Sequence, residues 1–191
     1  MNLTYGHHDV KFIASKGSEP SLTATALSWG RVKDTFVLDY PVDVVASSNG
    51  NRAPELKRAV SGIKLVMSDA VPTNAKEIQI TADRSLSLAL PTLAAAALGE
   101  TTVTMAFPSA WVGTKNNDAS TYTLCPSDEF TTDVSVKVIA TDNSVISDFT
   151  IEDVELKKNR ITTLTGEVFG RGSGFQVSID DTWEEGVNVN F

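Results

Sequence analysis

The feature that most constrains the fold is a run of alternating apolar and polar residues at positions 133–138. Val134, Val136 and Val138 alternate there with polar side chains. Successive side chains of a β-strand point to opposite faces, so this pattern predicts a strand with one buried face and one solvated face. Residues 141–144 are four consecutive turn formers, which predict a reversal into a second strand.

The second strand changes the parity of its apolar positions. They are odd-numbered as far as Ile151 and even-numbered from Val154 onward. A strand can keep one face buried through such a change only if it contains an extra residue. We therefore expect a β-bulge near Glu152 and Asp153.

A third strand is expected over residues 161–169, after a basic corner at residues 157–160. We expect the three strands to form an antiparallel meander. Such a meander cannot cover its own apolar face, so the remaining strands must supply a second layer.

The other expected strands lie on both sides of this unit. Residues 36–44 form a long strand pattern, with apolar side chains at alternate positions: Phe36, Leu38, Tyr40, Val42 and Val44. Pro41 has no backbone N–H to donate, which predicts an edge position for that strand. Further strands are expected around 10–12, 56–67, 76–81, 85–90, 101–107, 121–125 and 175–179.

Three local features complete the structural prediction. Gly62 lies inside a strand pattern and predicts either a bulge or a close backbone contact. Residues 93–98, which include four consecutive alanines, are the best helical candidate. Residues 21–33 have no clear period and predict a loop or a short helical turn, with Trp29 as its plug.

These patterns predict an all-β fold, an antiparallel Greek-key β-sandwich with at most one or two short helices. A chain of 191 residues can bury a substantial core. We expect a single domain over residues 1–191, with residues 1–35 partly in loops.

Composition excludes several classes of function. The formal net charge is -8, from 16 basic and 24 acidic residues, which argues against a nucleic-acid partner because phosphate binding requires a basic face. No apolar run approaches the roughly 18–20 residues of a transmembrane helix. Cys125 is the only cysteine, so there is no internal disulfide, and we expect a buried, inert thiol.

Candidate catalytic and metal-binding residues are few. His7 and His8 are the only histidines, and adjacent strand residues point to opposite faces, so they are poorly placed to share a metal ion. Asp128, Glu129 and Asp133 could be paired carboxylates of a glycosidase, but turn and strand-edge positions explain them as well. We therefore expect no catalytic residue, no metal and no cofactor, and predict that the chain is not an enzyme.

Two segments resemble a known family. Leu56-Lys57-Arg58-Ala59-Val60 is similar to a strand of the Bacteroidetes-type fimbrillins, the subunits of type V pili, and residues 151–162, followed by Gly166 and Phe169, are similar to a corner and strand of that family. The ending, from Phe175 to Trp183, resembles the anchor or accessory branch. This resemblance implies a transthyretin-like sandwich, export as a lipoprotein and display on the outer membrane in a fimbrium. It also implies that an N-terminal part of the precursor precedes this chain.

The resemblance further implies assembly by β-strand complementation, in which a strand of one subunit fills a groove in its neighbour. The expected partners are other pilus subunits, with host or bacterial surface ligands as a second class. One expected margin of the groove is the strand of Phe36, Leu38, Tyr40, Val42 and Val44. The other is the C-terminal strand of Phe175, Val177 and Ile179.

A second function stays open from the sequence. Trp29, Trp111 and Trp183 could form a stacking platform of a carbohydrate-binding or adhesion module, although core positions are the favoured explanation, because three tryptophans so widely spaced need not meet. A solvent-facing cluster of these side chains would favour carbohydrate binding.

Overall fold

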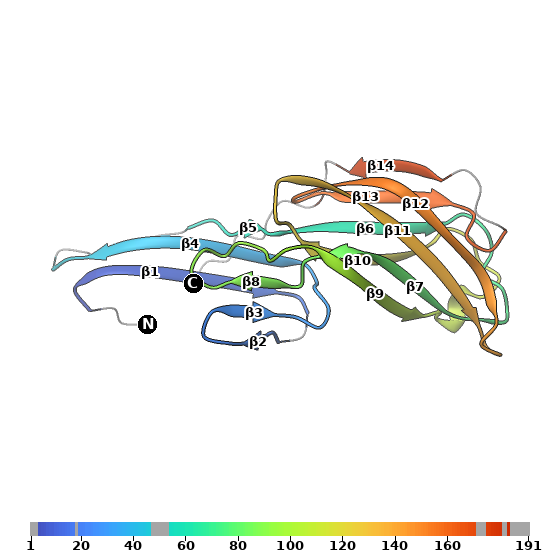
Figure 1. Cartoon of the computed structure of the whole chain (residues 1–191), viewed down its shortest axis with the longest axis horizontal. Helices are drawn as coiled ribbons and strands as arrows, with labels where there is room; N and C mark the ends of the chain where they lie inside the picture. Colours follow the sequence, from blue (N-terminus) through green and yellow to red (C-terminus); the bar gives the residue numbers. More distant parts are fainter. Residues whose placement is uncertain (1–3, 18, 47–53, 171–174, 181–182, 184–191) are drawn as a thin grey trace.

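A computed structural model of the chain describes residues 4–17, 19–46, 54–170, 175–180 and 183. Over these residues the protein has fourteen β-strands in four sheets, and its helical content is one short 3-10 turn, η1 (Ser109–Trp111). The prediction of an all-β sandwich is confirmed. Figure 1 shows a larger sandwich at one end of the long axis and a smaller lobe at the other. In the described part, no helix is both long and apolar enough to cross a membrane.

The larger sandwich consists of two four-stranded sheets. The strand order of the first is β10 (Asn117–Leu124), β6 (Val60–Met67), β13 (Ile161–Gly166), β14 (Gln176–Asp180). The order of the second is β12 (Val145–Lys157), β11 (Glu129–Ala140), β7 (Ala75–Arg84), β9 (Gly99–Ala106). Neighbouring strands in these sheets are antiparallel, except for β6 and β13, which are parallel.

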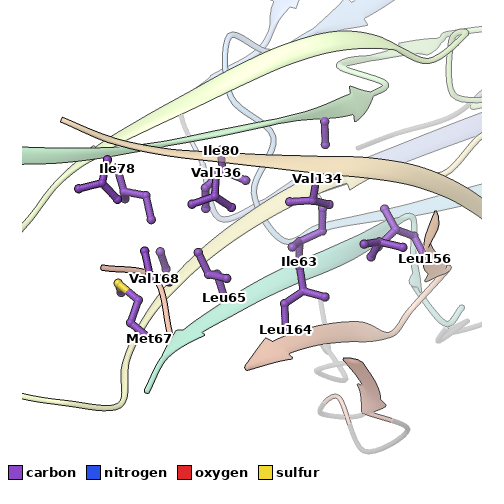
Figure 2. Packing of buried hydrophobic residues seen from close by; sticks show 14 residues of the cluster. Ile63, Leu65, Met67, Ile78, Ile80, Val134, Val136, Leu156, Leu164 and Val168 are labelled. Carbon is purple, nitrogen blue, oxygen red and sulfur yellow. The ribbon is translucent and has the colours of Figure 1, made fainter. Parts of the chain in front are cut away.

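The core of the larger sandwich lies between these sheets (Figure 2). Alternate residues of β6, including Leu65 and Met67, face alternate residues of β7 and β11, including Ile80 and Val136, and all four are fully buried. The side chains that fill the core are therefore those at every second position of these strands, as the alternating pattern predicts. Burying apolar side chains on both inner faces is the main stabilising contribution to a sandwich of this kind.

The predicted bulge is confirmed. Thr132 pairs with Val154 and Val134 pairs with Ile151, so β12 has one more residue than β11 across this interval. Asp153 adopts a left-handed backbone with φ of 53°, and its N–H donates to Asp133 Oδ1 at 3.0 Å. The extra residue allows Ile151 and Val154 to share one face despite their different parity.

The predicted antiparallel meander is wrong in its third strand. β11 and β12 do form an antiparallel pair, but β13 does not join them. After the corner at residues 157–160 the chain crosses to the other sheet, where β13 lies between β6 and β14. The apolar pattern defines which residues of a strand are buried, and either sheet of a sandwich satisfies it.

Gly62 makes the predicted close contact. It lies inside β6, whose register with β10 runs without interruption, so there is no bulge at this position. A Cβ atom at Gly62 would lie 3.2 Å from Ile161 Cγ1 and 3.5 Å from Tyr122 Cε1. Glycine here allows neighbouring side chains to cover the backbone of β6.

The smaller lobe has two three-stranded sheets. One has the order β1 (Gly6–Ser15), β4 (Thr35–Val44), β5 (Lys57–Arg58), and the other β2 (Ser21–Leu22), β3 (Ala26–Ser28), β8 (Ser87–Ala89). Its buried cluster contains Trp29, Val32 and Leu88, together with Val60 and Leu124 from strands of the larger sandwich. The two parts of the molecule therefore share apolar side chains where they meet.

Two predictions in this lobe need correction. Residues 93–98 are not helical, because Leu93 has a φ of 53° and the segment lies beside β8, with Ala96 N–H donating to Ser87 O at 2.9 Å. A two-turn helix has too few internal hydrogen bonds to compete with such pairing. Residues 21–33 contain the short strands β2 and β3 rather than a helical turn. The Trp29 side chain is buried, as predicted, at 3% exposure.

Candidate functional site

The centre of the contact between the two parts is a buried ion pair. Arg58 Nε lies 2.8 Å from Asp34 Oδ1, and Arg58 Nη2 lies 3.4 Å from Asp34 Oδ2. The side chains are 4% and 8% exposed, so both charges are largely removed from water. Lys16 Nζ, which is exposed, lies 3.2 Å from Asp34 Oδ2. A buried pair of this kind fixes the relative position of the strands that hold it, because neither charge is stable there alone.

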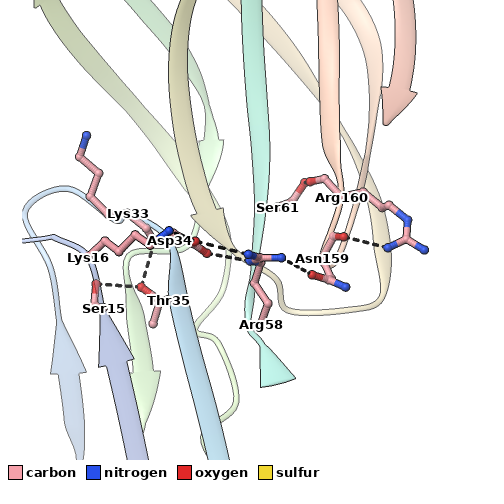
Figure 3. Close-up of polar contacts among 9 residues, drawn as sticks. All are labelled: Ser15, Lys16, Lys33, Asp34, Thr35, Arg58, Ser61, Asn159 and Arg160. Atoms are coloured by element: carbon pink, nitrogen blue, oxygen red, sulfur yellow. Dashed lines mark hydrogen bonds and ion pairs between the residues drawn. The ribbon is translucent and has the colours of Figure 1, made fainter. Parts of the chain in front are cut away.

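Arg58 also holds the corner between β12 and β13 (Figure 3). Its Nη1 donates to Asn159 Oδ1 at 2.8 Å. Asn159 has a left-handed backbone with φ of 59°, and its N–H donates to Val60 O at 2.9 Å. The two segments that carry the resemblance to fimbrillins thus meet through both hydrogen bonds, although Arg58 and Asn159 lie 101 residues apart in the chain.

Aromatic rings extend this contact. The Arg58 guanidinium lies 4.7 Å from the ring centre of Phe36 and 4.2 Å from that of Trp183. Trp183 in turn stacks on Tyr122, with ring centres 5.8 Å apart. Cation–π contacts of a desolvated guanidinium add to the ion pair. We call this group, Asp34, Phe36, Arg58, Tyr122, Asn159 and Trp183, the joint.

The joint positions strands but has no arrangement suited to chemistry. It contains a guanidinium, an amide, a carboxylate held by two cations and three aromatic rings. Catalysis of acyl or glycosyl transfer requires a positioned nucleophile or a free acid and base pair. The sequence pointed to Arg58 and Asn159 only through the family resemblance, and it gave no sign that they touch.

The first set of predicted assembly residues lies on one face of β4. Phe36 is buried, whereas Leu38, Tyr40, Val42 and Val44 are half-buried, and each faces a residue of β1 across an antiparallel pair. The predicted edge position needs correction, because β4 lies between β1 and β5. Among described strands, however, β5 pairs with β4 only at Phe36 and Val37.

The second set belongs to an edge strand of the other part of the molecule. Phe175 precedes β14, packs on the larger core and stacks on Phe149 with ring centres 4.9 Å apart. Val177 is 50% exposed, and Ile179 is half-buried. β14 and β4 lie in different sheets, so the structure does not bring the two predicted margins together.

The other candidates do not converge either. His7 Nδ1 is bonded to Asp43 at 2.8 Å, whereas His8 Nε2 is bonded to Thr4 O, so the two rings have different partners. Asp128 and Asp133 line two separate hollows, and Glu129 lies 3.8 Å from Lys157 Nζ.

The three tryptophans do not form one platform. Trp29 lies in the smaller cluster, and Trp183 packs against that cluster. Trp111 packs against the larger core, with an edge-on contact to Phe107. The sugar-stacking platform considered from the sequence is therefore not present.

The His7–Asp43 contact gives a pH-dependent prediction. The hydrogen bond to Asp43, with the charge of Asp43 acting in the same direction, raises the pKa of His7 above 6.5. The folded state therefore binds this proton more tightly than the unfolded state. Its stabilising effect on the β1–β4 pair is fully present below about pH 6.5 and is lost as the pH rises through the folded pKa.

An NMR titration of the His7 ring measures this effect directly. We expect the Asp43→Asn variant to titrate at a lower pH than the original chain. A pKa of His7 that is unchanged by Asp43→Asn would show that another group determines it.

Cys125 gives a second prediction. Burial raises the pKa of its thiol to about 12, and the side chain is 7% exposed. Because the thiolate is the reactive form, iodoacetamide at pH 8 should leave the folded protein unmodified over hours and should modify it within minutes in denaturant. Mass spectrometry checks both rates, and rapid modification of the folded protein would contradict the inert role.

Comparisons with known proteins complete the description. Residues 5–190 match the model of a family of unknown function, DUF6562. No curated protein is similar to the chain in sequence at a significant level. A candidate adhesin from Bacteroides ovatus ATCC 8483 has a TM-score of 0.56 at 12% identity, and the match covers 80% of this chain and 66% of that one. A candidate cell adhesion protein from the same strain has a TM-score of 0.46 at 11% identity, over 94% of this chain and 68% of that one.

The match therefore spans about two thirds of the length of these two proteins. At 12% identity the likeness to the candidate adhesin shows a shared fold.

Proposed function

The chain belongs to the DUF6562 family, whose function is unknown, and we propose that it is a structural or adhesion subunit of the bacterial cell surface. In this proposal it does no chemistry and joins other subunits through β-strand pairing. Its place would be the outer membrane or a fimbrium, reached as a lipoprotein precursor.

Two independent observations support a surface role. The fold is shared with a candidate adhesin of Bacteroides ovatus, of which the match covers 66%. The segments that resemble fimbrillins also make a direct contact, between Arg58 and Asn159. These observations favour a Bacteroidetes surface subunit, and the fimbrial role is the finer part of the proposal.

The observation that carries strand pairing is the position of β14. It is the last strand of its sheet, and among described strands it pairs only with β13. It also presents Val177, a β-branched apolar side chain that is 50% exposed. An exposed edge with apolar side chains is the surface to which another strand adds, because main-chain groups supply affinity and alternate side chains supply specificity.

Substituting Val177 tests the proposal. If subunits join at β14, Val177→Lys should weaken self-association of the purified chain, because a charge at the centre of the added pair opposes its burial. Val145→Lys is the matched control, since Val145 is 51% exposed and lies in β12, in the other sheet. Size-exclusion chromatography with light scattering measures the mass over a range of concentrations.

We expect concentration-dependent oligomers for the original chain and for Val145→Lys, and a monomer for Val177→Lys. Assembly through β14 would be contradicted if the original chain stayed monomeric at all concentrations, or if the two substitutions had equal effects on its mass.

A further inference from the structure

A hollow of about 460 Å³ lies beside the joint. It is lined by residues of β4 and β5 on one side and by the corner after β12 on the other. Its volume lies within the range of roughly 300–1,000 Å³ that small-molecule sites occupy, and such sites favour the boundary between two parts of a protein.

The inner surface of the hollow combines an apolar area with fixed polar groups. The half-buried side chains of Leu56 and Asn159 supply an apolar area and an amide, and the buried Phe36 and Arg58 form the floor. The charge of Arg58 is balanced by Asp34, and its hydrogen bond to Asn159 fixes the orientation of the amide, so Arg58 adds no net charge to the hollow.

The rim of the hollow has two charges of each sign. Lys57, Lys158, Glu55 and Asp128 are exposed there, and none of the four forms an ion pair with a described residue. The formal charge of the rim is therefore zero. It offers donors from the ammonium groups and acceptors from the carboxylates within one small opening.

Backbone hydrogen bonds fix the main chain of the corner after β12. Lys158 N–H donates to Asp128 O at 2.8 Å, which ties the corner after β12 to the segment before β11. Asn159 N–H donates to Val60 O at 2.9 Å. The backbone that carries Lys158 and Asn159 is therefore fixed before a ligand arrives, which removes the cost of ordering the corner.

We propose that this hollow binds a neutral oligosaccharide. Each sugar hydroxyl is both a donor and an acceptor, which matches a rim of mixed charges, and the C–H face of a sugar ring matches the apolar area. Because the formal charge of the rim is zero, attraction and repulsion largely cancel for an anionic or a cationic ligand, so neither gains net electrostatic affinity. This inference deepens the proposed surface role, because it names the class of ligand that an adhesion subunit would recognise.

The experiment uses the full chain and a glycan array that presents neutral, sialylated and sulfated oligosaccharides. We expect binding to neutral glycans, weakened about tenfold or more by Lys158→Ala and by Asp128→Asn. The matched controls are Lys115→Ala and Glu152→Gln, which remove an exposed lysine and an exposed carboxylate away from the hollow. Circular dichroism of each variant separates loss of binding from loss of fold.

Three results would overturn the inference: no binding to any neutral glycan, equal losses in the rim variants and the controls, or a preference for acidic glycans. Failure of strand assembly has a different signature. The Val177→Lys variant should keep full glycan binding, and the Lys158→Ala variant should keep its state of association.

Discussion

Replacing Arg58 with alanine is expected to lower the free energy of unfolding by about 3–5 kcal/mol. The substitution leaves Asp34 almost fully buried, with only the exposed Lys16 ammonium beside it. It also removes the donor to Asn159 and the cation between Phe36 and Trp183. The destabilisation is large because the buried Asp34 carboxylate loses its partner at a position where water cannot solvate it.

Two variants separate the buried charge from simple loss of packing. Lys16→Ala should cost no more than about 0.5 kcal/mol, because the Lys16 side chain is 66% exposed. The double variant Arg58→Met, Asp34→Leu should recover much of the loss, since it removes both charges together. Urea unfolding measures all three. A cost below about 1 kcal/mol for Arg58→Ala would show that the joint does not hold the two parts together.

Replacing Gly166 with alanine is expected to destabilise the protein by about 1–3 kcal/mol and to loosen β14. A Cβ atom at Gly166 would lie 2.6 Å from Phe175 Cδ1 and 2.8 Å from its Cε1. The ring must move to relieve this clash, and its stack on Phe149 is then disturbed. Phe175 packs on the core next to β14, so the strand that should take part in assembly is affected first.

Two comparisons test the cause of this effect. Gly99→Ala should be nearly neutral, because a Cβ atom there would meet nothing within 4 Å. Phe175→Leu should cost less in the Gly166→Ala background than in the original chain, because a smaller side chain relieves the clash. Equal costs in both backgrounds, measured by urea unfolding, would show that the contact is not the source of the destabilisation.

The sequence predicted those features that depend on which residues of a strand are buried. The parity change after Ile151 led to the bulge at Glu152 and Asp153, because the period of a strand is strictly two. Gly62 predicted a bulge or a close contact, and the structure has the contact, for which glycine leaves room. Both inferences rest on a property of the residue's own strand, its period of two or its missing Cβ atom, and do not require that the distant partner be known.

The features that the sequence did not predict depend on partners distant in the chain. The apolar pattern of residues 161–166 is the same whether β13 pairs with β12 or with β6, so it does not distinguish the predicted meander from the observed pairing. The alanines of 93–98 have a helical preference that pairing with β8 overrides. Arg58 and Asp34 lie 24 residues apart, and no spacing rule connects them.

Amide hydrogen exchange of residues 176–180 tests strand pairing through β14 most directly. If subunits join at this edge, protection of the β14 amides should rise when the chain is concentrated enough to associate, because outward-facing N–H groups then find acceptors. The exchange rates of the β9 amides should not change, because β9 is an edge strand of the other sheet of the larger sandwich. Unchanged exchange in β14, an equal change in β9, or no association at any concentration would contradict the account.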